Sequence, residues 1–177
     1  VVILDTGTRR GLVGSAYNER RSQVDAAAAA LGVDVLRDVT TDVLRERGRE
    51  LDPVVRKRAR HVVLENARVL RAAEAMRIGD ADRLGALMND SHASLRDDFE
   101  VSGDALDAIV EAAQAQDGCY GARMTGAGFA GCAVALVREA SVDAFCEAVE
   151  TRYRAATEHE PALYPVRASD GAGRSEG

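Results

Sequence analysis

A glycine-rich segment between two strand-like stretches is the feature that most constrains the fold of this chain. Residues 119–124 and 132–137 have the length of short strands, and glycines occupy positions 126, 128 and 131 between them. Glycine tolerates the positive φ angles that tight turns require. The segment therefore predicts two neighbouring strands joined by a glycine turn.

Helical periodicity accounts for most of the remaining chain, because apolar residues recur at the spacing of one helix face. Predicted helices cover about 15–31, a short stretch after Thr40, 53–78, 81–95, 103–117 and 142–153, and predicted strands cover 1–6, 119–124, 132–137 and 163–167. Ser15, Asp52, Asp80, Ser102 and Ser141 are the predicted N-caps. This order predicts the α+β class, with helices packed on a small antiparallel sheet.

The helix predicted from Pro53 carries both an apolar stripe and a basic run. Its expected inner face consists of Val55, Ala59, Val62, Val69, Ala73 and Met76. The basic run at 56–61 is expected to be a solvated face, since the whole chain carries a net charge of -6.

The chain opens on an apolar strand at 1–6 with no partner nearby in the sequence, although a single strand needs neighbours in a sheet. This indicates a chain cut from a longer protein. A natural N-terminus after removal of methionine is an equal alternative.

Composition excludes several classes of function. The chain has 29 acidic residues against 23 Lys and Arg, which argues against a nucleic-acid partner and against a polybasic membrane surface. No apolar run is long enough to cross a membrane. The three cysteines fit no zinc or disulfide framework, so reduced thiols in a cytoplasmic protein are expected.

Three segments have side chains suited to chemistry, and each has a plainer interpretation. The glycine turn could present N–H groups to an anion, but a simple hairpin turn is the more common case. It is neither a Walker A loop nor a Rossmann fingerprint. Tyr17 and the arginines after it could face a cleft or only solvent. His92 near Asp97 and Asp98 could form a site, although such groups are more often structural.

These segments, in this order, resemble the galactokinases of the GHMP kinase superfamily. Residues 17–21 (Tyr-Asn-Glu-Arg-Arg) resemble a Tyr-Asn-x-Arg-Arg segment, and residues 91–102 resemble a Ser-His-x-Ser-Leu-Arg-x-Asp-Tyr-Glu-Val-Ser stretch. Residues 121–131 resemble the third GHMP motif in its Arg-Met-Thr-Gly form. The resemblance covers the chain to about Asp170 and implies the C-terminal domain of the GHMP kinase fold.

The resemblance implies one half of a two-domain enzyme that transfers the γ-phosphate of ATP to the anomeric hydroxyl of D-galactose. ATP and Mg²⁺ would be bound mainly by an N-terminal half of the same enzyme, which would also supply the catalytic residues. No catalytic or metal-binding residue is therefore expected in this chain, and the chain alone should be inactive. Residues 1–14 would be a remnant of the N-terminal domain, 15–167 the C-terminal domain and 168–177 a flexible tail.

Site residues carry over from the resemblance in two groups. Tyr17 matches a tyrosine that contacts the sugar. An active-site glycine loop would comprise Thr125, Gly126, Ala127, Gly128, Phe129, Ala130 and Gly131. Structural roles are implied for Arg20, Arg21, His92, Arg96, Asp97 and Asp98.

Departures from the family pattern leave other functions open. Ala130 stands where the family usually has glycine, and a positive φ there would cost about 1 kcal/mol. Phe99 replaces a usual tyrosine. The alternatives are another GHMP sugar kinase, such as an N-acetylgalactosamine kinase, and a non-catalytic sugar sensor, which the alanine favours.

Overall fold

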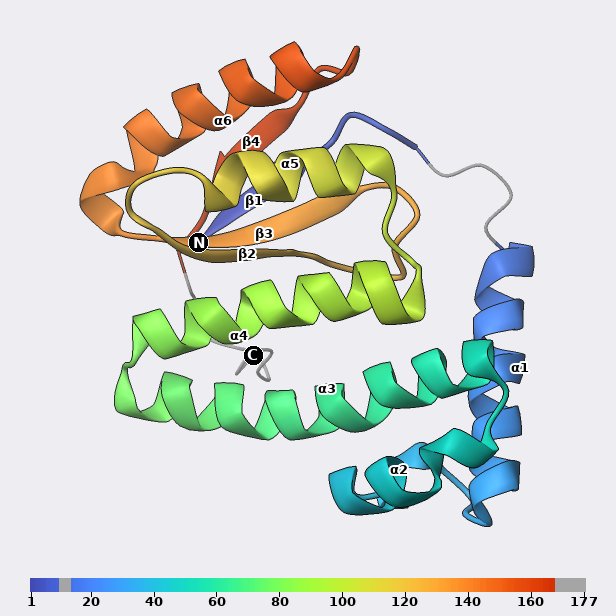
Figure 1. The fold of residues 1–177 in the computed structure, drawn as a ribbon. Coiled ribbons are helices and arrows are strands. Elements are labelled where there is room, and N and C mark those ends of the chain that lie inside the picture. Colours follow the sequence, from blue (N-terminus) through green and yellow to red (C-terminus); the bar gives the residue numbers. More distant parts are fainter. Residues whose placement is uncertain (10–13, 168–177) are drawn as a thin grey trace, which may run out of the picture.

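The computed structural model describes residues 1–9 and 14–167, and it shows a small sheet with helices on both faces (Figure 1). The strands are β1 (Val2–Asp5), β2 (Cys119–Met124), β3 (Cys132–Val137) and β4 (Ala162–Pro165). The helices are α1 (Gly14–Leu31), α2 (Thr41–Arg47), α3 (Pro53–Ile78), α4 (Ala81–Ser94), α5 (Asp104–Gln114) and α6 (Val142–Ala156). The predicted α+β class with an antiparallel sheet is confirmed.

The helices form layers around the sheet. Helices α5 and α6 cover one face, where Val2, Leu4, Ala135, Phe145 and Tyr153 are buried together. Helix α4 lies on the other side of the sheet, with α3 beyond it (Figure 1). Helices α1 and α2 pack at one end of α3 and form a second apolar core with it.

Strand β1 lies in the middle of the sheet, which has the order β2-β3-β1-β4. Ile3 pairs with Val134 on one side and with Tyr164 on the other. Strand β1 therefore belongs to the same sheet as β3 and β4, and the assignment of residues 1–14 to an N-terminal domain stays a prediction. The partners of β1 lie far along the chain, so no local sequence signal could reveal them.

Several helix ends agree with the predicted caps. The Asp52 side chain accepts a hydrogen bond from Val54 N–H at 2.9 Å, and Asp80 accepts one from Arg83 N–H at 2.9 Å. Gly79 ends α3 with φ of 71°. The prediction for Ser102 is wrong, because Gly103 occupies the N-cap of α5.

Some predictions are wrong or fall outside the described part of the chain. Ser141 occupies the N-cap position of α6, but its side chain makes no capping hydrogen bond. The predicted flexible tail at 168–177 and the predicted cap from the Ser15 side chain lie outside the described residues.

The burial of α3 agrees with the prediction only in part: Ala59 is fully buried, and Val55 and Val62 pack against the same apolar cluster. Val69 and Met76, expected inside, are 57% and 61% exposed. Arg58 and His61, expected in solvent, are only 2% and 6% exposed. The first half of α3 is covered by other segments that supply hydrogen-bond partners for these polar groups, and this makes their burial possible.

Helix α4 approaches β2 unusually closely because two glycines face each other. A Cβ built on Gly85 would lie 2.0 Å from the carbonyl oxygen of Tyr120, and one built on Gly121 would lie 2.1 Å from Gly85 O. No side chain fits at either position. The pair therefore sets the distance between α4 and the sheet, and with it the place of the segment that follows α4.

In the described part of the chain, no helix combines the length and apolar character needed to cross a membrane.

Candidate functional site

Two segments more than a hundred residues apart in the sequence meet at one cavity of about 470 Å³. Tyr17, Arg20 and Arg21 line it from α1, and Gly126, Ala127 and Phe129 line it from the glycine loop between β2 and β3. Tyr17 is 52% exposed, so its phenol is accessible to a ligand. The structure thus brings Tyr17 and part of the glycine loop together at one cavity.

The floor of the cavity comes from three other elements. Val62 belongs to α3, and Leu95 and Phe99 belong to a π-helical turn, Leu95–Phe99, that continues α4. Val101 follows directly. Single π-turns inserted in α-helices are frequent at functional sites, because the wider turn redirects side chains and carbonyl groups.

The glycine loop owes its shape to positive φ angles. Gly126, Gly128 and Gly131 have φ of 78°, 83° and 97°. A Cβ at Gly128 would lie 2.0 Å from Val101 O, so this position also requires a missing side chain. The N–H of Phe129 donates a hydrogen bond of 2.7 Å to the same oxygen. The loop is therefore held against the floor of the cavity.

The strained position in this loop is Phe129, with φ of 66°, rather than Ala130. Ala130 is buried and lies outside the positive-φ region, so alanine there carries no strain of the left-handed kind. The possible penalty that the sequence suggested for Ala130 does not arise. Phe129 keeps its conformation through the hydrogen bond of its N–H and the contact of its ring with an apolar cluster.

Two arginines hold the end of the π-turn. Arg20 Nε donates to Phe99 O at 2.7 Å, and Arg20 Nη2 donates to Glu100 O at 3.2 Å. Buried Arg58 donates to Asp98 O at 2.5 Å and pairs with the Glu100 carboxylate at 2.7 Å. These contacts agree with the structural role implied for Arg20, and Arg58 gains a role that the sequence did not suggest.

The hydrogen bonds of Glu100 also affect its titration. The bond from Arg58 and then the bond from Lys57 lower the pKa of the Glu100 carboxyl to about 2. The carboxylate is therefore charged throughout the neutral and mildly acidic range.

His92 lies under β2 and is almost completely buried. Its Nδ1 accepts a hydrogen bond from Met124 N–H at 3.3 Å, and its Nε2 lies 3.2 Å from the Asp107 carboxylate. Met124 immediately precedes the glycine loop. His92 therefore supports that loop from behind and does not reach the cavity.

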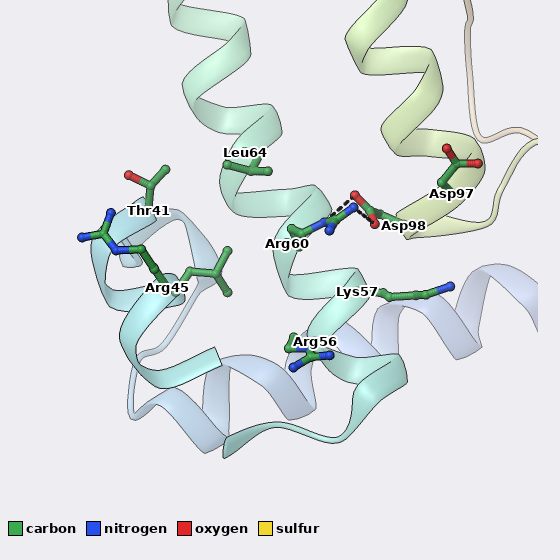
Figure 2. A pocket seen from close by; sticks show the side chains of 9 residues that line it. Thr41, Arg45, Arg56, Lys57, Arg60, Leu64, Asp97 and Asp98 are labelled. Carbon is green, nitrogen blue, oxygen red and sulfur yellow. Dashed lines mark hydrogen bonds and ion pairs between the residues drawn. The ribbon is translucent and has the colours of Figure 1, made fainter. Parts of the chain in front are cut away.

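A second cavity, of about 600 Å³, lies between α2, α3 and the π-turn (Figure 2). Figure 2 shows Arg60 reaching Asp98, with contacts of 2.9 and 2.6 Å. Two other basic side chains near this cavity also have carboxylate partners: Arg45 pairs with Asp42 and Lys57 pairs with Glu100. The pairs of Arg60 and Lys57 tie α3 to the π-turn and to Glu100, which follows it.

Two exposed side chains from the segment after α4 pair with each other, and Arg96 also lies 3.9 Å from the Glu111 carboxylate on α5. Arg96 pairs with the neighbouring Asp97 at 2.8 Å, and both side chains are substantially exposed. The bond lowers the pKa of the Asp97 carboxyl. Neither residue reaches the cavity of Tyr17.

The described residues contain no group of three or more His, Cys, Asp or Glu side chains placed to hold a metal ion. Cys119, Cys132 and Cys146 are free, and burial is the first cause that raises the pKa of each thiol, that of Cys119 to about 11. None of them is therefore an activated nucleophile.

Sequence reasoning missed the buried polar residues of α3 and the bracing role of Glu100. His61 stacks on Phe99 with ring centroids 4.6 Å apart, and its Nδ1 lies 3.0 Å from Ser94 Oγ. A dense run of arginines ending in a histidine, on an acidic chain, was the available signal. The spacing of Arg58 and His61 in the sequence could not show that another segment covers their side chains.

Comparison with known proteins agrees with this geometry. Residues 72–155 match the family described as GHMP kinases C terminal. The chain is 49% identical over 179 residues to a galactokinase of Roseiflexus sp. (strain RS-1), and 44% identical over 176 residues to one of Clostridium beijerinckii. The alignments cover 98% and 97% of this chain but only 46% and 45% of those proteins. The chain therefore spans about half the length of these relatives.

Solved structures show the same relationship. The Lactococcus lactis galactokinase, crystallised with galactose, superposes with a TM-score of 0.89 and 40% identity. The match covers 92% of this chain and 43% of that protein. The mevalonate kinase of L. major, at 23% identity and a TM-score of 0.56, shares the fold.

Proposed function

We propose that the chain forms part of a galactokinase, since residues 72–155 match the C-terminal domain of GHMP kinases and nearly the whole chain is similar to galactokinases. The enzyme would transfer the γ-phosphate of ATP to the anomeric hydroxyl of D-galactose. The remainder of the relatives' length corresponds to the partner half that would complete the active site.

One observation carries this proposal: Tyr17 and the glycine loop line the same cavity. A phenol combines an apolar ring, suited to the face of a sugar, with a hydroxyl that can donate and accept hydrogen bonds. We assign Tyr17 to sugar binding. The exposed side chain of Tyr17 leaves it within reach of a sugar held by a second domain.

The glycine loop is suited to stabilise negative charge. In the described part of the chain, the N–H groups of Gly126 and Ala127 donate to no other residue, and both positions line the cavity. Free N–H groups in a turn of glycines form a concave site for anions. In our proposal they support the phosphate-binding loop of the partner half, and catalysis rests on positioning and charge stabilisation.

Among the described residues, no group of three or more His, Cys, Asp or Glu side chains is placed to hold a metal ion, and no step through Mg²⁺ is assigned to this chain. MgATP and the catalytic residues would belong to the partner half. The free cysteines suit a cytoplasmic location, which is part of the same proposal.

A chimera tests the function directly. This chain would replace the matching segment of the Roseiflexus galactokinase, and ADP release would be measured with galactose, N-acetylgalactosamine and mevalonate in turn. We expect turnover with galactose. The isolated chain should show none under the same conditions, because half of the cleft cannot surround the reacting groups.

Each alternative has its own outcome in this experiment. Turnover with N-acetylgalactosamine but not galactose would favour the sister kinase. Galactose binding by the folded chimera without turnover would favour a sensor. Tyr17→Phe should raise the KM for galactose about tenfold, as expected when one hydrogen bond to a substrate hydroxyl is lost. An unchanged KM would contradict the assignment of Tyr17.

A further inference from the structure

Four consecutive carbonyl oxygens in the segment 98–101, here called the carbonyl strip, each accept a hydrogen bond from a distant part of the chain. The donors are Arg58 Nη1 to Asp98 O at 2.5 Å, Arg20 Nε to Phe99 O at 2.7 Å, Arg20 Nη2 to Glu100 O at 3.2 Å, and Phe129 N to Val101 O at 2.7 Å. Helix α1, helix α3 and the glycine loop thus converge on four residues.

The strip is available for such contacts because it follows the end of a helix. The last carbonyl groups of a helix have no partners within it, and they carry partial negative charge that attracts cations. Glu100 has φ of 53°, which turns the chain out of the helix. The N–H of Val101 still donates to Leu95 O at 3.1 Å, and this hydrogen bond closes the π-turn. The carbonyl oxygens of residues 98–101 are then left for donors from other segments.

Arg20 connects the strip to the sugar side of the cavity. It lies on α1, one helical turn after Tyr17, so a displacement of Arg20 displaces Tyr17 as well. Its guanidinium spans two successive carbonyl groups and is largely buried, with 12% side-chain exposure. Two hydrogen bonds from one rigid planar group fix direction as well as distance.

Phe129 connects the strip to the loop side of the cavity. Its N–H is held by Val101 O, and Gly128 packs against the same oxygen. The two walls of the cavity are therefore joined through three residues, 99–101, and through hydrogen bonds at each end.

The two arginines also share one acceptor. Gln23 Oε1 lies 2.9 Å from Arg58 Nε and 3.5 Å from Arg20 Nη1, so this amide links the guanidinium from α1 to the guanidinium from α3. Arg58 is braced in turn by its pair with Glu100. The carbonyl strip is thereby held by Arg58 from α3 and by Arg20 from α1. Of these two arginines, Arg20 is the one that fixes the position of α1.

We propose that Arg20 is a positioning residue that sets the distance between Tyr17 and the glycine loop through the carbonyl strip. Its expected effect on sugar binding rests on the proposed function. Its effect on the loop does not, because the loop is joined to the strip whatever ligand the cavity takes.

Amide hydrogen exchange of the chain tests the positioning role. In Arg20→Gln, the N–H of Phe129 should exchange about tenfold faster, as expected when charged hydrogen bonds that hold its acceptor are lost. Arg20→Lys, which retains the charge but loses the two-carbonyl geometry, should give a smaller increase. The amides of β1 and β3 serve as internal references for global unfolding.

Arg47 provides a matched control. It also donates to two carbonyl groups at the end of a helix, Leu31 O at 2.9 Å and Ala30 O at 3.3 Å, but it lies away from the cavity. Arg47→Gln should leave the exchange of Phe129 unchanged. If Arg20→Gln unfolds the chain, the exchange rate of the Phe129 N–H is compared in Arg20→Lys instead. An unchanged exchange rate at Phe129 in a folded Arg20 variant overturns the proposal.

The chimera separates this proposal from the proposed function. There, Arg20→Lys should raise the KM for galactose several-fold with a smaller change in kcat, because the sugar side of the cavity is misplaced. A chimera without any turnover would count against the galactokinase function. The exchange experiment would still decide the role of Arg20.

Discussion

Gly128 and Val101 approach so closely that a Cβ on the glycine would lie 2.0 Å from the valine carbonyl oxygen. Through this contact the glycine loop rests on the segment that follows α4. Position 128 therefore combines two requirements, a positive φ and an absent side chain.

Gly128→Ala should destabilise the chain by about 2–4 kcal/mol, because the left-handed conformation is strained and backbone atoms must also move. Gly131→Ala is the matched control, since Gly131 has φ of 97° but a Cβ added there would meet no atom of the described residues within 4 Å. It should cost only about 1–2 kcal/mol. Urea denaturation of both variants measures the difference, and equal losses would contradict the role of the Val101 contact.

Ala130→Gly should not stabilise the chain, although the family resemblance suggests a glycine at this position. Ala130 has no positive φ and is buried, so glycine removes a packed methyl group and adds backbone freedom to the unfolded state. We expect a loss of about 1 kcal/mol in the free energy of unfolding. A clear gain in urea denaturation would show that the position needs glycine after all.

Gly85→Ala should be among the most damaging substitutions in the chain. The added methyl group would meet the backbone of Tyr120 at 2.0 Å, so α4 would have to move away from the sheet. A loss of about 3 kcal/mol or more is expected, as for other overpacked interiors.

Gly48→Ala is the control for this prediction, because its nearest neighbour would be a Leu44 methyl group at an ordinary 3.4 Å. It should change stability by less than about 0.5 kcal/mol. Thermal or urea unfolding of the two variants compares them. Similar stabilities would show that α4 can shift without loss.

Because of His61, we expect the free energy of unfolding to fall in mild acid. Burial lowers the pKa of its imidazole from 6.5 to about 4, an effect strengthened by Arg68 and opposed by Glu65. Between these two pH values the unfolded chain binds a proton that the folded chain does not, so stability present above pH 6.5 is lost as the pH falls toward 4. In His61→Gln the free energy of unfolding, measured by urea denaturation, should fall less steeply over this window.

Because of Glu100, we expect a separate fall in the free energy of unfolding at lower pH. Its folded pKa of about 2 lies below the ordinary value of 4.5, chiefly because Arg58 and Lys57 donate to its carboxylate. Stability from this group is present above pH 4.5 and is lost as the pH falls toward 2. Urea titrations between about pH 5 and 3 should show a shallower slope for Glu100→Gln than for the parent chain, whereas the slope above about pH 5 should be the same.

The sequence by itself determined features that depend on neighbouring residues. Helix ends at Asp52, Gly79 and Asp80 and both strands around the glycine turn were predictable, because caps, positive φ angles and apolar periodicity act over a few residues. Together with three matching segments, these local signals also indicated the family and the two groups of residues that meet at the cavity.

Only the tertiary structure decided what depends on contacts between distant segments. It placed β1 in the centre of the sheet, buried Arg58 and His61, and freed Ala130 from the strain that Phe129 carries instead. The physical reason is common to all of these. A strand, a buried cation or a turn takes its environment from partners far along the chain, and their identity is settled by packing and hydrogen bonding in the folded molecule.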